Sequence, residues 1–257
     1  MQIEDALSHV QNACSNIAGG PYGEDHYFHV HRLRFAHTLM RLSYLENIGR
    51  MLEIGSDGLF LRLGRYVLSA TEVAGTVHHE GEPTAFVGND YFQFQFYGVD
   101  LESTQLPVPD GSFDTVVCGE VIEHMARDPM ALLQEINRLL PIGGHCLITT
   151  PNISSYRNID MALQRQVPMN FYKFRKDGSL DRHHIEYTPK LLCEFLETAG
   201  FEISICVTEN CWSASHDSLQ QFVEKNGYSP HDRGDNIFVM CKKIGPVLER
   251  YPDIMYV

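Results

Sequence analysis

Apolar and polar positions follow two periods that alternate along most of the chain. Apolar runs of strand length occur within 50–58 and at 67–75, 92–100, 112–120, 145–152, 201–209 and 235–243. Helical spacing of apolar residues predicts helices at 58–66, 128–144 and 188–200. Strands that alternate with helices predict an α/β fold with a seven-stranded, mostly parallel sheet and helices on both faces. The polar stretch 76–92 between two strands predicts a hairpin or an excursion.

Capping residues mark the ends of two of these helices. Asp128 and Thr188 are suitable N-caps, and a proline follows each at the first helical position. Gly143 and Gly200 stand where the same helices close. The helix boundaries are therefore expected near these four residues.

The first 47 residues are expected to form an N-terminal helical lid. Phe35, Leu39, Leu42 and Leu45 recur at helical spacing and give one apolar face. The segment 21–35 before and within it is rich in aromatic residues and histidines. Two interpretations stay open: an amphipathic lid helix, or part of a substrate pocket.

The acidic charge of the chain limits its partners. The 257 residues carry a formal net charge of −13, so binding to a phosphate backbone is not expected, and no nucleic-acid partner is predicted. The N-terminal twenty residues do not resemble a signal peptide, and no run of about 18 apolar residues predicts a membrane span. The seven cysteines lack a C-x-x-C pair, which favours reduced thiols and a cytoplasmic protein over a disulfide framework.

Acidic residues gather at the ends of the expected strands. Glu53, Glu72, Asp100 and Glu120 each lie near such an end. Ligands of open parallel sheets bind beyond the carboxyl ends of the strands, where these carboxylates would repel phosphate. Carboxylates hold ribose hydroxyls, amines and cations, so the pattern fits S-adenosylmethionine better than a dinucleotide or ATP.

The order of several motifs resembles the class I S-adenosylmethionine-dependent methyltransferases, of type 11/23. The resemblance spans about 48–243 and rests on LEIGSDG, YGVD, LPVPDGSFD, GEVIEH, LLPIGG and LITTPN. It implies a Rossmann-like fold and S-adenosylmethionine as cofactor. The combination is specific, whereas any one motif alone is weak.

The resemblance also implies cofactor contacts. Glu53 and Gly55 would shape the loop under the methionine part, Glu72 would bind the ribose, and Asp100 would lie near the adenine amine. The full expected set is Glu53, Gly55, Ser56, Asp57, Gly58, Glu72, Asp100, Leu101, Cys118, Gly119 and Glu120. The glycine loop departs from the family pattern, because Asp57 and Leu59 stand where glycines are usual. Gly58 compensates for the missing glycines if the loop is shifted by one residue relative to the family pattern. The alternative is a methyltransferase-like scaffold that no longer binds the cofactor.

The GEVIEH segment suggests a divalent metal. A helix that starts near Glu120 would place Glu120, Glu123 and His124 on one face, and this set suits Mg²⁺ or Mn²⁺. With the later H-x-x-E-Y-T, the pattern resembles small-RNA 2′-O-methyltransferases and ubiquinone-pathway O-methyltransferases. That resemblance adds His183 as a fourth ligand and His184 as a base.

A site without metal is the alternative. Glu123 and His124 would then cap the helix and bond to loop backbone. An imidazole would have to take the acceptor's proton, and the catalytic candidates are His124, His183 and His184.

The segment 152–188 is expected to form the acceptor wall within the methyltransferase domain 48–243. Its aromatic, arginine and asparagine side chains suit a sugar, and its motif order resembles bacterial polysaccharide-locus O-methyltransferases. The first hypothesis is O-methylation of a sugar or glycan precursor. The alternatives are a small aromatic or natural-product acceptor, RNA 2′-O-methylation, and a non-catalytic scaffold. The tail 244–257 is expected to pack on the domain or a partner, and a homodimer is one open oligomeric state.

Overall fold

An eight-stranded sheet forms the centre of the protein. The structure is a computed structural model that describes residues 1–15, 26–87, 94–168, 174, 176, 182–213 and 216–257. The strands are β1 (Arg50–Ile54), β2 (Glu72–Val77), β3 (Thr84–Val87), β4 (Gln95–Gly98), β5 (Thr115–Gly119), β6 (His145–Pro151), β7 (Phe201–Glu209) and β8 (Asn236–Lys243). Their order in the sheet is β3-β4-β2-β1-β5-β6-β8-β7.

Five neighbouring strands, β4, β2, β1, β5 and β6, are parallel, which confirms the mostly parallel sheet. Strands β8, β7 and β3 pair antiparallel with their neighbours. The sheet has one strand more than predicted, because 84–87 folds back on β4 within the segment expected to be a hairpin or excursion. There Phe86 stacks on Phe96 with ring centroids 5.6 Å apart.

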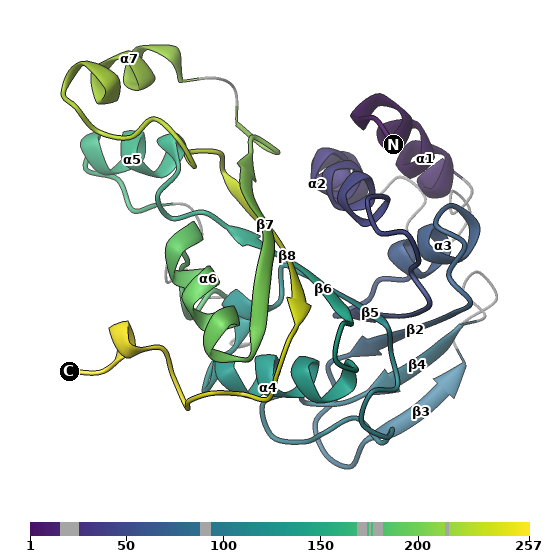
Figure 1. The fold of residues 1–257 in the computed structure, drawn as a ribbon. Coiled ribbons are helices and arrows are strands. Elements are labelled where there is room, and N and C mark those ends of the chain that lie inside the picture. Colours follow the sequence, from purple (N-terminus) through teal and green to yellow (C-terminus); the bar gives the residue numbers. More distant parts are fainter. Residues whose placement is uncertain (16–25, 88–93, 169–173, 175, 177–181, 214–215) are drawn as a thin grey trace.

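Helices cover both faces of the sheet, as predicted (Figure 1). They are α1 (Ile3–Ser15), α2 (His26–Leu42), α3 (Leu59–Tyr66), α4 (Pro129–Leu139), α5 (Tyr156–Leu163), α6 (Pro189–Thr198) and α7 (Asp217–Lys225), with 3₁₀ turns η1 (Ile122–His124) and η2 (Asp253–Met255). Helices α1, α2 and α3 lie on one face and α4 and α6 on the other, while α5 and α7 pack together at one end. The predicted N-caps are confirmed, since Asp128 and Thr188 accept backbone N–H bonds at the starts of α4 and α6. Gly200 follows the C-cap of α6 as predicted, whereas α4 ends at Leu139, four residues before Gly143.

Each face of the sheet has its own apolar core. Fully buried Ile136 of α4 and Phe195 of α6 belong to one cluster. Leu39 of α2 and Leu61 of α3 belong to the other, together with residues of α1. The N-terminal helices are thus packed into the same body as the sheet.

The second strand begins later than predicted. Residues 67–71 connect α3 to β2, and the backbone N–H of Thr71 donates to Gly49 at 2.9 Å. β2 therefore starts at Glu72, opposite Arg50 at the start of β1. This register places Glu72 at the amino end of its strand.

The C-terminal segment begins by packing on the domain. Asn137 Nδ2 donates to the carbonyl of Gly245 at 2.9 Å, and the Leu248 N–H donates to Thr198 at 2.8 Å. Arg250 forms an ion pair with Asp128. Beyond it, the large apolar side chains of 254–257 are exposed.

Two further sequence expectations concern the whole chain. All seven cysteines are free thiols in the structure. No helix among the described residues combines the length and apolar character that a membrane crossing requires.

Candidate active site

The site lies where the chain changes direction across the sheet. From β1 the chain continues to β2 and β4 on one side, and β5 and β6 lie on the other. Gly55 follows β1 and Gly119 ends β5, so both lie at the carboxyl edge at this switch point, where α/β sheets bind ligands.

Two glycines shape the loop between β1 and α3. Gly55 has φ +68° and Gly58 has φ +92°, values that L side chains rarely adopt. A Cβ at Gly55 would also lie 2.6 Å from Val121 Cγ2. Gly58 ends the loop, and the buried Leu59 begins α3 directly behind it. Gly58 thus supplies the second positive-φ turn of the altered loop.

One buried carboxyl group, that of Glu53, and one partly buried carboxyl group, that of Asp57, lie at this loop. Ser56 Oγ donates to Glu53 and accepts the N–H of Gly58 at 3.0 Å. Burial and the neighbouring Asp57 carboxyl raise the pKa of Glu53 well above its ordinary value. Burial also raises the pKa of Asp57. The loop therefore concentrates acidic groups that a cationic ligand would stabilise in their charged form.

A small cavity is present beside these carboxyl groups. It is lined by Glu53, Gly55, Asp57, Phe60, Val117 and Gly119 from the sheet side, and by Tyr27, Arg34, Phe35 and Thr38 from α2. Its volume is about 20 Å³, which is room for roughly one water molecule. A nucleoside-sized ligand enters only if α2 side chains at its rim move.

Arg34 supplies the positive charge of this cavity. It is 3% exposed, its Nη2 donates to the hydroxyl of Tyr27 at 3.1 Å, and its Nε has no hydrogen-bond partner. Burial alone would lower the pKa of Arg34, but the negative charge of Glu120, then Tyr27 and Asp57, raises it. A buried guanidinium with an unused donor is available for an anionic group.

The structure corrects the prediction for Glu72. It is exposed at the amino end of β2, opposite Arg50 of β1. The position of β2 that lies opposite Ile54, at the carboxyl end of β1, comes four residues later. Four residues of strand span about 13 Å, so Glu72 is at the opposite edge from the glycine loop. The prediction that Glu72 binds the ribose is wrong, because the strand register of 67–92 was misplaced.

Of the other expected cofactor residues, Asp100 and Leu101 lie at the carboxyl edge of the sheet, whereas Cys118 lies in the apolar core. Asp100 follows β4 at the carboxyl edge, where it accepts hydrogen bonds from Ser103 at 2.8 Å and Arg127 at 3.0 Å. Leu101 is partly buried against the core next to it. Cys118 is fully buried in the core on the α4 and α6 side, so its thiol lies away from the cavity lined by its neighbours.

Glu120 is held in an unusual backbone conformation. Its φ is +57°, which costs a non-glycine residue about 1 kcal/mol or more. Its Oε1 accepts hydrogen bonds from Thr149 Oγ1 and Asn236 Nδ2, both at 2.9 Å. The expected α-helix is therefore wrong: the chain turns at Glu120 and forms only the 3₁₀ turn η1. Glu120, Glu123 and His124 do not share a helix face.

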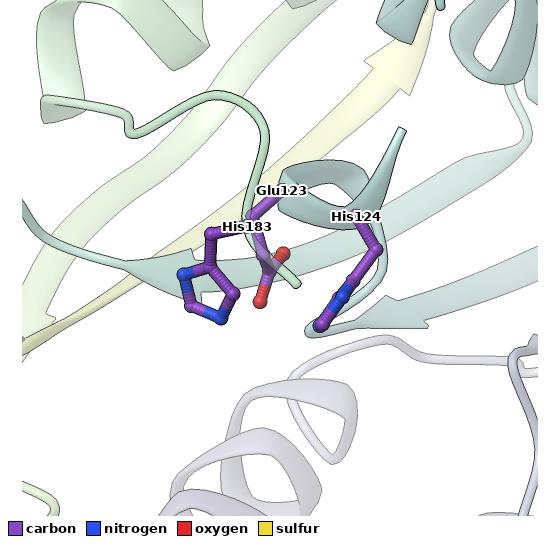
Figure 2. Close-up of side chains that lie close together, drawn as sticks. All are labelled: Glu123, His124 and His183. Carbon is purple, nitrogen blue, oxygen red and sulfur yellow. The ribbon is translucent and has the colours of Figure 1, made fainter. Parts of the chain in front are cut away.

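Three of the four proposed metal ligands nevertheless come together. One ligand atom each from Glu123, His124 and His183 lies within 4.8 Å of the others (Figure 2). Figure 2 shows the Glu123 carboxylate between the two imidazole rings, whose centroids are 5.0 Å apart. Glu120 is outside this cluster because its carboxylate is bonded to Thr149 and Asn236.

Glu123 has an unused ligand atom. The side chain is buried, Oε2 accepts from Thr150 Oγ1 at 2.9 Å, and Oε1 has no hydrogen-bond partner. Burial, reinforced by Glu120, raises the pKa of Glu123 well above its ordinary value. A buried oxygen without a donor is costly, and a cation or a ligand hydroxyl would satisfy it.

Glu186 orients His183. Its Oε1 lies 2.9 Å from His183 Nδ1, so Nδ1 carries the hydrogen and Nε2 is left to bind a ligand. Neighbouring His184 donates its backbone N–H to the carbonyl of Glu123 at 2.7 Å. This bond ties the 182–188 loop to η1, and the loop brings His183 beside His124.

Sequence reasoning missed several residues around the site. Arg34 lies in the aromatic segment 21–35, but its place in the cavity depends on how α2 crosses the sheet. Asn236 contacts Glu120 and Trp212 contacts His31 of α2, and both residues are far from GEVIEH in sequence. No motif marks them, although 210–213 follow the end of β7 and Asn236 begins β8.

A family model for the methyltransferase domain matches residues 27–204 of the chain. The chain belongs to the methyltransferase-domain family. Membership implies S-adenosylmethionine as cofactor, in agreement with the sequence prediction. The match begins at residue 27 and therefore includes α2.

Two relatives agree with this assignment. A probable S-adenosylmethionine-dependent methyltransferase of Mycolicibacterium smegmatis is 37% identical over 99 residues, 38% of this chain and 32% of that protein. The ubiquinone biosynthesis O-methyltransferase of Xanthomonas euvesicatoria is 29% identical over 140 residues, 52% of this chain and 55% of that protein. The chain thus spans about a third and about half of the length of these relatives.

Solved structures confirm the fold. A chain of the complex between the Haloferax volcanii Trm112 methyltransferase activator and a methyltransferase has a TM-score of 0.55 at 17% identity, covering 92% of this chain and 98% of that one. An S-adenosylmethionine-dependent methyltransferase of Thermotoga maritima has a TM-score of 0.55 at 19% identity, covering 90% and 99%. The Rossmann-like methyltransferase fold predicted from the sequence is therefore confirmed.

Proposed function

We propose that this protein transfers the methyl group of S-adenosylmethionine to a hydroxyl oxygen of a ring-shaped acceptor. The observation that carries the proposal is the unpartnered, buried Glu123 Oε1 between His124 and His183. It lies beyond β5, four residues after Gly119, which lines the cavity in which the family implies the methyl donor. An acceptor hydroxyl or a cation at this oxygen would be next to the reacting methyl group.

The cavity charges match the methionine part of the donor. Glu53 and Asp57 suit its ammonium group, and Arg34 suits its carboxylate. The closed cavity means that Tyr27 and Arg34 shift when the donor binds. Asp57 replaces a glycine of the family pattern, and its carboxyl group adds attraction for a cation rather than removing the site.

The cluster Glu123, His124 and His183 fits a divalent metal. The fit rests on the free Glu123 oxygen and on His183, which Glu186 orients as a second-layer carboxylate does at metal sites. Two imidazoles and one carboxylate are softer than the predicted set with Glu120, so Mn²⁺ is preferred over Mg²⁺. A metal here supplies Lewis acidity that lowers the pKa of an acceptor hydroxyl.

The remaining chemistry belongs to side chains of this chain. With His124 and His183 as ligands, His184 is the imidazole left to accept the acceptor's proton. Asn236 holds Glu120 through Nδ2 and presents Oδ1, which has no hydrogen-bond partner, to a second hydroxyl. Fixed polar groups of this kind orient an acceptor for in-line attack on the methyl group.

A sugar or glycan precursor is the acceptor that we propose first. The supporting features are the aromatic and polar side chains of 152–188, although 169–173, 175 and 177–181 lie outside the described residues. A small aromatic diol is the second candidate, because the Xanthomonas relative is an O-methyltransferase of ubiquinone biosynthesis. RNA is disfavoured by the net charge of −13.

An acceptor panel read by mass spectrometry tests the proposal. It contains sugar nucleotides, oligosaccharides, catechols and amines, each with S-adenosylmethionine and with Mn²⁺ or EDTA. We expect a gain of one methyl group on a hydroxyl compound, lost in EDTA. Glu123→Gln should lose Mn²⁺ binding and most turnover, whereas Glu197→Gln on the exposed surface of α6 is the matched control. Methylation of amines alone, or full turnover in EDTA, would refute the hydroxyl or the metal part respectively.

The cytoplasm is the proposed compartment, because seven free thiols are typical of a reducing environment. A homodimer stays a prediction, and sedimentation of the purified chain tests it.

A further inference from the structure

A rigid turn at the end of β7 holds the only tryptophan of the chain. The buried carboxylate of Asp235 accepts three backbone N–H bonds from this turn, from Cys211 at 2.7 Å, Trp212 at 3.1 Å and Ser213 at 2.7 Å. Asp235 is 3% exposed, and the next residue, Asn236, is bonded to Glu120. The turn is thereby fixed relative to the active-site edge.

Trp212 connects this turn to α2. Its indole Nε1 donates to His31 Nδ1 at 3.1 Å, and the two ring centroids are 5.6 Å apart. Burial and the Arg34 cation lower the pKa of His31 to about 4, so the ring is neutral near pH 7 and Nδ1 can accept. The bond therefore joins the acceptor side of the site to the helix that carries Arg34.

From His31 the contact continues to Arg34. The ring of His31 lies against that of Tyr27 with centroids 4.4 Å apart, and the Tyr27 hydroxyl accepts from Arg34 Nη2 at 3.1 Å. Tyr27 is 42% exposed, and its ring also lies near Phe28 and Phe35, with centroids 5.7 and 6.2 Å apart. The other half of α2 is anchored independently, because Leu39 and Leu42 are fully buried. The first two turns are held by the buried Phe28, which belongs to the apolar core, and by the contact of His31 with Trp212.

We propose that Trp212 and His31 are positioning residues that set Arg34 for the methionine carboxylate of the methyl donor. The inference rests on the proposed binding of S-adenosylmethionine in the cavity. It goes further by assigning two residues outside the cavity lining a role in donor recognition. It also predicts that a contact on the acceptor side tunes affinity on the donor side.

A pair of ligands isolates this role. S-adenosylhomocysteine carries the carboxylate that Arg34 would hold. Decarboxylated S-adenosylhomocysteine is the same molecule without this carboxylate. Calorimetry gives the dissociation constant of each ligand, and their ratio measures how well the carboxylate is recognised. One charged hydrogen bond changes such a ratio by about tenfold or more.

The variants separate the hydrogen bond from packing. Trp212→Phe keeps an aromatic ring but removes the N–H, and His31→Phe removes the acceptor. We expect each to reduce the ratio about tenfold, and the double variant to be no worse than either single one, since both break one contact. His31→Asn, whose amide oxygen can accept in place of Nδ1, should keep the ratio within about threefold of wild type. Thermal melts confirm that every variant is folded.

The outcomes separate this inference from the proposed function. If wild-type protein binds neither ligand, the proposed donor site itself fails. If wild type prefers S-adenosylhomocysteine and Trp212→Phe weakens both ligands equally, the residues are structural and the inference is overturned. A reduced ratio in both phenylalanine variants, with recovery in His31→Asn, supports it.

Discussion

Gly55 is constrained in two separate ways at the residue scale. Its φ of +68° disfavours any side chain, and a Cβ would lie 2.6 Å from Val121 Cγ2. Gly81 has a φ of +103° but no atom within 4 Å of the same position. The two glycines therefore separate backbone strain from steric overlap.

We expect Gly55→Ala to destabilise the fold by about 1–3 kcal/mol more than Gly81→Ala, since overpacking adds to strain. Urea unfolding measures both free energies. Gly55→Ala should also lose binding of S-adenosylhomocysteine, while Gly81→Ala retains it. Equal destabilisation by the two substitutions would contradict the overlap with Val121.

His31 makes stability depend on pH. Its pKa is lowered from 6.5 to about 4 by burial and by Arg34, and Trp212 and Tyr27 are the other groups that face it. Between pH 6.5 and about 4, the unfolded chain binds a proton that the native protein excludes. The contribution of His31 to the free energy of unfolding is therefore full above pH 6.5 and decreases as the pH falls through this window.

Urea unfolding at pH 7.5 and pH 5.0 tests this dependence. The wild type should lose more stability between the two values than His31→Asn, which cannot take up the proton. The comparison of the two proteins cancels the carboxyl groups that they share. An identical loss in both would show that His31 does not titrate in this way.

The sequence motifs correctly placed the residues within them at the carboxyl edge of the sheet. Glu53, Gly55, Asp57 and Gly119, which the family resemblance implies as cofactor contacts, all line one cavity. Glu72 was misplaced because the polar connection around it has no periodic pattern, and its register is decided by pairing with β1. Arg34 could not be assigned because its contacts are made across the sheet edge.

At the scale of elements, local capping chemistry decides where helices start. Thr188 Oγ1 accepts the N–H of Leu191 at 3.2 Å at the start of α6. Thr188→Ala should cost about 1 kcal/mol of stability, and Thr188→Ser should restore most of it, because the hydroxyl is the capping group. Urea unfolding of the three proteins checks this order, and an unchanged alanine variant would contradict the cap.

The segment after β5 shows where local spacing fails. The i, i+3, i+4 pattern of Glu120, Glu123 and His124 suggested one helix face. Hydrogen bonds from Thr149 and Asn236 instead hold Glu120 in a left-handed backbone conformation. Both donors are far from Glu120 in sequence, so local spacing cannot show that they offset the backbone strain. The cluster with His183 still forms because the loop 182–188 is tied to η1.

For the whole molecule, alternating strands and helices were enough to predict the architecture. The eighth strand was missed because its pairing, Thr84 to Val87 on β4, lies at the exposed sheet edge and buries little. The acidic residues at the strand ends pointed to a cationic ligand, and the carboxyl groups of Glu53 and Asp57 line the cavity. The size of the closed cavity had no signal in the sequence.

The central claim is that this edge of the sheet binds S-adenosylmethionine. Calorimetric titration of the wild-type chain with S-adenosylmethionine, beside the Glu53→Gln variant, tests it most directly. The account predicts saturable binding at one site in the wild type and at least about tenfold weaker binding in the variant, which loses a charged partner of the ammonium group. Absence of saturable binding to the folded wild-type protein, or equal affinity in both proteins, would contradict it.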